Sequence, residues 1–279
     1  MSAKRQLSIF NFLDFKAFLK SRFEELKKKE GKSLRRISLE LECGSLGYVS
    51  MILNGKRSPG AAFLKKTAAY LGLTAEEERY LRKLVRFSLA ENLDEKDLAY
   101  RSILKEFTSK NVQTIREKEY KFFSEWYHPV ILEYLSLGRD IDQVLHISQA
   151  LDISAKEVEN SLKLLRSLDF IEEEAGLYKT KLISFQTTPE VNSFYVRKHH
   201  RMMLERSMRA LSLPLEKRFF ASLTVSMDEA ELPKLKKRAE EFQKELLAEY
   251  SESKIKNQVI HFNLQIFPAL HLKQTREDN

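Results

Sequence analysis

The stretch SLRRISLELECGSLGYVSMILNGKRSPGAAFLKKTAAYLGL, residues 33–73, decides the fold of the N-terminal part of the chain. It holds three short apolar-periodic segments separated by two breaks. In the first segment, Leu34, Ile37 and Leu41 recur at three- and four-residue spacing, which predicts one apolar stripe on a short helix. We therefore expect two short helices around a turn, followed by a third helix that packs on them.

The turn is predicted at Cys43-Gly44, where the helical period breaks. Glycine often ends a helix in a left-handed conformation, and Ser45 beside it is a favourable N-cap for a second helix over residues 46–53. Asn54-Gly55 ends that helix. Its predicted buried residues are Val49, Ile52 and Leu53. Two helices joined in this way have the layout of a helix-turn-helix.

The run YVSMILNGKRSP, residues 48–59, resembles the second half of the Xre/lambda-repressor type of helix-turn-helix domain. In that family a recognition helix ends in a similar Asn-Gly-Lys-Arg and a proline starts the next segment, so the resemblance implies binding to DNA. Two features depart from the family pattern. Ser38 stands where the family usually has Ala, and the turn glycine arrives late, at Gly44, with Glu42 near its usual position. These departures predict a turn one residue longer than usual.

The side of the second helix that would face DNA bases carries no Arg and no Gln. Bidentate contacts to guanine and adenine come from Arg, Lys, Asn and Gln, so Asn54 is the one obvious base reader. This pattern favours DNA binding over strong sequence discrimination. The predicted base-facing residues are Ser45, Leu46, Gly47, Tyr48, Ser50, Met51 and Asn54.

Basic residues flank this helix where DNA phosphates pass in helix-turn-helix complexes. Lys56 and Arg57 follow it directly, and Arg35 and Arg36 lie off the apolar stripe of the first helix. We expect these four side chains to contact phosphates.

The charge of the chain is concentrated at this end. Residues 1–90 contain 19 Lys or Arg and 9 Asp or Glu, or +10, whereas residues 91–279 contain 29 and 31, or −2. Neutralising phosphates and releasing their counterions supplies most non-specific affinity for DNA. The charge split therefore predicts double-stranded DNA as the partner of residues 1–90.

A second module is predicted over residues 122–188, with three helices and then a hairpin around Ala175-Gly176, the pattern of a winged helix. Residues 91–190 carry 13 basic and 19 acidic side chains, and three glutamates at 172–174 would repel phosphates from the wing. We interpret this module as structural or dimerising in preference to a second DNA reader. If it binds DNA, its third helix offers Lys156, Asn160, Lys163 and Arg166.

The C-terminal third reads as a basic helix over residues 192–211, a strand over 218–227, a helix over 232–250 and a strand over 258–270. A strand-helix-strand order predicts two parallel strands with a crossover helix. Two strands make a poor sheet alone, so they must pair with the wing or with another copy of the chain. We predict a homodimer assembled through the C-terminal half.

A second resemblance rests on the blocks HHRMMLERSMRAL, RFFASLTVSM and IHFNLQIFPAL. Placed behind an N-terminal helix-turn-helix, they look like a bacterial family of predicted transcriptional regulators whose C-terminal half is a domain of unknown function. The resemblance implies a regulator but gives no operator, sign of regulation or effector.

The predicted fold is thus mainly α with a minor β part. It comprises a helix-turn-helix domain, a connecting helical segment, a winged-helix-like module and a C-terminal unit that dimerises or senses a signal. The predicted boundaries are 1–90, 91–121, 122–188 and 189–279.

Several functional classes find no support in the sequence. The six histidines have no HExxH-like spacing, and a Gly-rich phosphate loop and a GxSxG motif are lacking, so we predict no enzyme, no metal and no cofactor. The lack of a long apolar run and the single Cys predict a cytoplasmic protein without a membrane partner. The alternative to a regulator is a protein-interaction adaptor, whose helical module binds a partner and whose basic surface is incidental.

Overall fold

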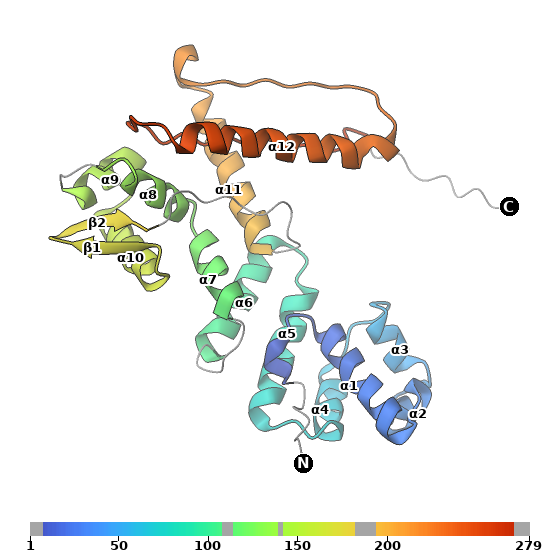
Figure 1. The fold of residues 1–279 in the computed structure, drawn as a ribbon. Coiled ribbons are helices and arrows are strands. Elements are labelled where there is room, and N and C mark those ends of the chain that lie inside the picture. Colours follow the sequence, from blue (N-terminus) through green and yellow to red (C-terminus); the bar gives the residue numbers. More distant parts are fainter. Residues whose placement is uncertain (1–7, 108–113, 139–141, 182–193, 271–279) are drawn as a thin grey trace. The chain divides into compact units, whose positions relative to one another are not determined.

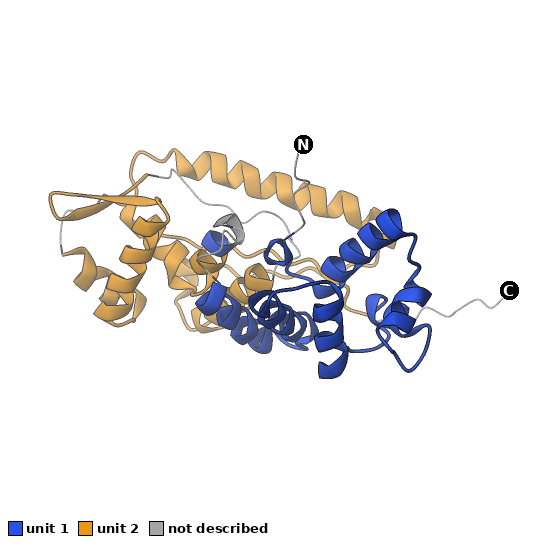
Figure 2. Cartoon of the chain, turned by 90° about the horizontal axis from the view of Figure 1, so that it is seen from below, with its two compact units in different colours: residues 1–119 blue, residues 120–279 orange. Residues whose placement is uncertain are grey.

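The computed structural model describes residues 8–107, 114–138, 142–181 and 194–270. The chain forms two compact units, residues 1–119 and 120–279 (Figure 2). Helices dominate both units, and the described residues contain one two-stranded sheet (Figure 1). The predicted fold class, mainly α with a minor β part, is confirmed.

Unit 1 is built of helices, and the last of them, α7, runs across the boundary between the units. Its elements are η1 (Ile9–Asn11), α1 (Phe15–Glu30), α2 (Leu34–Glu40), α3 (Tyr48–Leu53), α4 (Ala61–Tyr70), α5 (Ala75–Leu89), α6 (Leu93–Phe107) and α7 (Thr114–Phe123).

Side-chain caps set where these helices begin. The Thr74 hydroxyl accepts a hydrogen bond from the Glu77 amide, and the Glu77 carboxylate accepts one from the Thr74 amide, which forms a capping box at the start of α5. Asp14 accepts a hydrogen bond from the amide of Lys16 over 2.7 Å. Because Asp14 is the N-cap, α1 begins at Phe15.

The core of unit 1 forms around α1, which packs against both α3 and α5. Its largest fully buried side chains include Tyr80, Phe15, Phe18 and Phe23. The Tyr80 hydroxyl donates a hydrogen bond to the Phe12 carbonyl over 2.9 Å, which satisfies the one polar group of this buried ring. Aromatic contacts then join α6 to α5, since the Tyr80 and Phe107 ring centroids lie 5.1 Å apart. Residues after 90 therefore extend the core of unit 1.

Unit 2 begins with the predicted three helices and hairpin. Its first elements are α8 (Tyr127–Leu135), α9 (Gln143–Leu151), α10 (Ala155–Ser167), β1 (Ile171–Glu174) and β2 (Leu177–Thr180). The strands are antiparallel, with Glu174 opposite Leu177. The two turn residues Ala175 and Gly176 have φ of 51° and 81°, as a two-residue hairpin turn with both residues left-handed requires. Ser154 forms the capping box that opens α10.

Gln143 at the start of α9 covers the outer edge of β2. Its side-chain nitrogen donates to the Tyr178 carbonyl over 3.0 Å, and its side-chain oxygen accepts from the Tyr178 amide over 2.7 Å. An amide side chain thus takes the place that a further strand would occupy beside Tyr178.

The rest of unit 2 is α11 (Phe194–Ala210), η2 (Leu215–Lys217), η3 (Glu229–Glu231) and α12 (Leu232–Ser251). The two helices agree with the prediction. The two strands expected over 218–227 and 258–270 were wrong, because neither segment is a strand in the structure (Figure 1). A strand exists only where another strand accepts and donates its backbone hydrogen bonds, and these segments find no such partner among the described residues.

Candidate nucleic-acid interface

The turn between α2 and α3 differs in detail from the prediction. Glu42, and not Gly44, takes the left-handed conformation that ends α2, with φ of 51°. The Cys43 amide donates to the Ser38 carbonyl over 2.9 Å and closes this end of the helix. The predicted N-cap Ser45 is also wrong, since α3 begins at Tyr48 and Gly47 is its N-cap without a side-chain hydrogen bond. The longer turn delays the second helix by two residues.

The missing N-cap of α3 is replaced by Ser38, which lies on the neighbouring helix α2. Its side chain is buried, its hydroxyl donates to the Leu34 carbonyl over 2.9 Å, and its oxygen accepts from the Val49 amide over 3.4 Å. The amides in the first turn of a helix have no partner within the helix, so a hydroxyl at this position satisfies one of them. This gives a physical reason for Ser at the position where the resembling family usually has Ala.

The apolar residues of the motif lie as predicted in their essentials. Ile37, Leu41, Val49 and Ile52 are buried, which fixes α2 and α3 against the rest of unit 1. Leu34, however, is exposed and does not belong to the core, and Leu53, which was predicted to be buried, is only half-buried.

The opposite side of α3 and the turn before it are open to solvent. Ser45, Leu46, Gly47 and Asn54 are exposed, and the remaining predicted base-facing residues are partly exposed: Tyr48, Ser50 and Met51. The Asn54 side-chain nitrogen donates to the Ser50 hydroxyl over 3.3 Å, which orients the amide at the end of the helix.

Arg57 is held in place by an aromatic stack. Its guanidinium lies 4.8 Å from the centroid of the Tyr48 ring, and that ring lies 5.3 Å from the Phe63 ring of α4. The stack links the cation after α3 to the first residue of α3, so the arginine needs little further ordering to contact an anion. Lys56 beside it is exposed.

A third cation at this end of α3 comes from α1 and was missed by the sequence reasoning. The Lys16 ammonium lies 3.6 Å from the position that a Cβ would occupy on Gly55. Lys16 is 39 positions before Gly55, and only the packing of α1 against α3 brings them together. A basic residue in the first turn of α1 was the available signal, but its relation to the motif is not visible in sequence spacing.

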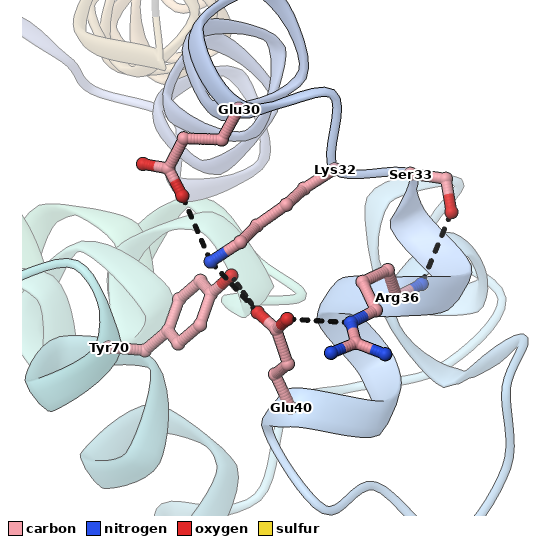
Figure 3. Close-up of polar contacts among 6 residues, drawn as sticks. All are labelled: Glu30, Lys32, Ser33, Arg36, Glu40 and Tyr70. Atoms are coloured by element: carbon pink, nitrogen blue, oxygen red, sulfur yellow. Dashed lines mark hydrogen bonds and ion pairs between the residues drawn. The ribbon is translucent and has the colours of Figure 1, made fainter.

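A network of charged and polar side chains joins α2 to α4 and to Lys32, which precedes α2 (Figure 3). Glu40 accepts a hydrogen bond from the Tyr70 hydroxyl over 2.7 Å and one from the Arg36 Nε over 2.8 Å, and it forms an ion pair with Lys32 at 3.0 Å. The Tyr70 hydrogen bond, followed by those from Arg36 and Lys32, lowers the pKa of Glu40 to about 2. The Arg36 Nε is thus committed to a structural contact, while Arg35, the other predicted phosphate contact on α2, is exposed.

Two of the four residues of the possible second DNA surface on α10 are paired with carboxylates. Arg166 pairs with Glu173 of the hairpin at 2.7 Å, and Lys156 pairs with Glu159 at 3.5 Å. Asn160 and Lys163 are exposed. The hairpin glutamates are therefore balanced by cations of their own module.

Two buried histidines lie in unit 2. The His128 Nδ1 lies 2.8 Å from the Ser161 hydroxyl, and burial lowers the pKa of His128 to about 4. Burial lowers the pKa of His199 to about 4 as well, and its ring lies 5.0 Å from that of Phe123. Both imidazoles are neutral packing groups at pH 7.

Neither a metal-binding cluster nor a helix suited to span a membrane is found among the described residues. No group of three His, Cys, Asp or Glu side chains there is arranged to hold a metal ion. None of the described helices has both the length and the apolar character that a membrane span needs.

Comparison with known proteins gives a family but no function. No curated protein and no solved structure matches the chain. The family model described as "Domain of unknown function (DUF4423)" matches residues 107–269, which lie wholly outside the predicted helix-turn-helix. Since the match covers more than half of the sequence, the chain belongs to the DUF4423 family.

Proposed function

We propose that the chain binds double-stranded DNA through unit 1, with α3 docked in the major groove, and that it acts as a transcriptional regulator. The observation that supports this most is the state of the cations at the end of α3. Lys16, Lys56 and Arg57 form no ion pair with any carboxylate among the described residues. On α10, in contrast, Lys156 and Arg166 are both paired.

Unpaired cations at one end of an exposed helix suit a phosphate backbone. Lys16 and Lys56 would contact phosphates as point charges, and the stacked Arg57 would offer a guanidinium already in position. The exposed amide of Asn54 would then reach a base edge. The phosphate contacts would fix the position of α3 on the DNA, whereas a single base contact would discriminate only weakly between sequences.

The test is the salt dependence of binding to random duplex DNA, measured by fluorescence anisotropy with the full chain. Each lost phosphate contact should reduce the slope of log affinity against log salt by about 0.9. We expect this reduction for Lys16→Ala, and a larger one for Lys56→Ala combined with Arg57→Ala. Lys163→Ala on α10 is the matched control, because it also removes an exposed lysine.

An unchanged slope in both N-terminal variants would contradict the assignment of these cations to DNA. A reduced slope in Lys163→Ala alone would instead assign the DNA-binding surface to unit 2.

An adaptor remains the second candidate, because apolar side chains are exposed on the same motif. Leu39 on α2 is 56% exposed and Leu46 in the turn is 52% exposed. Exposed leucines of this kind suit a protein partner better than a phosphate backbone. An adaptor predicts no measurable affinity for random duplex at low salt, so the same titration separates the two functions.

A further inference from the structure

The segment KRFFASLTVSMDE, residues 217–229, is an extended stretch without a partner. Its backbone is extended at both ends, with φ and ψ of −143° and 154° at Arg218 and −69° and 128° at Asp228. Residues 219–227 make no backbone hydrogen bond to any described residue. Large apolar side chains stand in solvent here, since Phe219 is 89% exposed and Leu223 is 86% exposed.

The side chains of this segment alternate as in a strand that has one buried face. Ser222, Thr224 and Ser226 fall on the even-numbered side, together with Phe220. Period-two alternation is the pattern of a half-buried strand, so the segment has the sequence of a strand but lacks the second strand. The odd-numbered side is wholly apolar: Phe219, Ala221, Leu223, Val225 and Met227.

The hairpin of the same chain is a poor partner. Gln143 already occupies the outer edge of β2 at Tyr178, and β1 is only four residues long. A short strand that carries Glu172, Glu173 and Glu174 would leave most of this thirteen-residue segment unpaired.

The segment is, however, complementary to itself. It begins with Lys217-Arg218 and ends with Asp228-Glu229, and these pairs lie equally far from Leu223. An antiparallel pairing with a second copy, about a two-fold axis at Leu223, therefore places Lys217 opposite Glu229 and Arg218 opposite Asp228. Opposite charges directly across two strands stabilise a pair.

The same axis also matches the apolar face. Residues opposite each other are both odd or both even, so Phe219 meets Met227 and Ala221 meets Val225 on one continuous face. An axis between two residues would put the apolar sides of the two copies on opposite faces of the sheet. An axis at Ser222 or Thr224 would keep the faces but lose the charge pairs. The hydrophobic pattern thus requires an axis that passes through a residue, and the charge pairs select Leu223 among such axes.

We propose that residues 217–229 form an antiparallel two-stranded ribbon with the same residues of a second copy of this chain, centred on Leu223, and that this ribbon makes the protein a homodimer. The contact is isologous, because each copy offers the same strand to the other. The inference stands on unit 2 alone and does not depend on DNA binding, although such a dimer would carry two copies of α3.

The first test is sedimentation equilibrium of the full chain without DNA. We expect a dimer for the native sequence, and for Leu223→Glu a dissociation constant raised by roughly tenfold or more, because two carboxylates would meet at the axis. Ser222→Glu is the matched control, since it adds the same charge on the even-numbered side, where the ribbon places it opposite Thr224. Both positions are exposed in the single chain, so neither variant should disturb its folding.

The second test uses charge exchange. An acidic variant combines Lys217→Glu with Arg218→Glu, and a basic variant combines Asp228→Lys with Glu229→Lys. Each variant alone places like charges opposite each other and should be monomeric. An equimolar mixture restores opposite charges at every pair and should form heterodimers.

Three results would overturn the proposal. They are a native chain that is monomeric across the concentration range, a Leu223→Glu dimer as tight as the native one, and a charge-variant mixture that stays monomeric. Far-ultraviolet circular dichroism checks that every variant is folded.

Discussion

The Tyr70 hydroxyl of α4 donates a hydrogen bond to the Glu40 carboxylate of α2 over 2.7 Å and thereby joins the two helices that flank α3 in sequence. Arg36 and Lys32 contact the same carboxylate. The ionised form of Glu40 therefore holds three different segments of unit 1 together.

This network should make unit 1 sensitive to acid. Because the pKa of Glu40 is lowered from 4.5 to about 2 by Tyr70, Arg36 and Lys32, its stabilisation is complete above pH 4.5 and is lost as the pH falls toward 2. Glu40→Gln should reduce the fall in thermal midpoint across this range, measured by circular dichroism. Glu24→Gln, at an exposed carboxylate of α1, should leave that fall unchanged.

Ser38→Ala should destabilise unit 1. The variant removes the hydroxyl that accepts from the buried Val49 amide, so we expect a loss of about 0.5–1.5 kcal/mol. Hydrogen exchange at the Val49 amide reports this directly and should accelerate. Ser45→Ala, at the exposed serine that does not cap α3, should leave exchange at Val49 unaffected.

Glu42→Gly should stabilise unit 1 even though it removes an ion pair. Glu42 has φ of 51°, a conformation that costs a side-chain-bearing residue free energy and costs glycine little. Its pair with Lys66, at 2.6 Å, is exposed and contributes little. Glu42→Ala loses the pair but keeps the strain, so the difference in thermal midpoint between the two variants isolates the backbone effect. A midpoint of Glu42→Gly at or below that of Glu42→Ala would show that the strain at this position does not exceed the entropy that glycine adds to the unfolded chain.

Unit 2 should lose stability in mild acid through His128. Its pKa falls from 6.5 to about 4 on burial, so the neutral imidazole is fully compatible with the fold above pH 6.5, and stability is lost as the pH falls from 6.5 toward 4. The loss should be on the order of 2–3 kcal/mol. Urea unfolding followed by the fluorescence of Trp126, the single tryptophan, measures it. His128→Gln should remove the share of this dependence due to His128 and leave the share due to the buried His199, and His146→Gln, at a partly exposed histidine, should leave the dependence unchanged.

Asn54→Ala should relax sequence discrimination on DNA. If the Asn54 amide makes a bidentate contact with adenine, the variant should lose about 1–3 kcal/mol of discrimination for the preferred site. The ratio of specific to random-duplex affinity, measured on a site selected from a random pool, gives this quantity. Retention of both the preferred site and the ratio in the variant would place recognition on other residues.

Sequence periodicity predicted the helices well because each carries its own signals. Thr74 and Ser154 open capping boxes, and the apolar stripes of α5 and α10 face their cores. The start of α3 was predicted less well. Ser45 is a good N-cap in isolation, but the burial of Val49 beside Ser38 fixes where the helix begins.

The predicted strands failed for a different physical reason. Residues 218–227 and 258–270 have suitable side chains, but a helix makes its hydrogen bonds within itself, whereas a strand depends on another chain segment. Local pattern therefore shows that a segment is able to pair, and it does not show where the partner lies. The role of Lys16 was not predicted for the same reason, because its place near Gly55 depends on the packing of α1 against α3.

Because Lys16 lies beside Gly55, residues 33–59 are not complete without α1. A fragment cut at Ser33 would keep every residue that resembles a helix-turn-helix, yet it would lose one of the three cations at the end of α3. It would also lose Phe15, Phe18 and Phe23, whose rings fill the core on which the motif rests. If unit 1 binds DNA as proposed, transplanting residues 33–59 onto another scaffold should transfer the proposed base-facing surface without its full affinity, and the smallest useful graft begins at Asp14, the N-cap of α1.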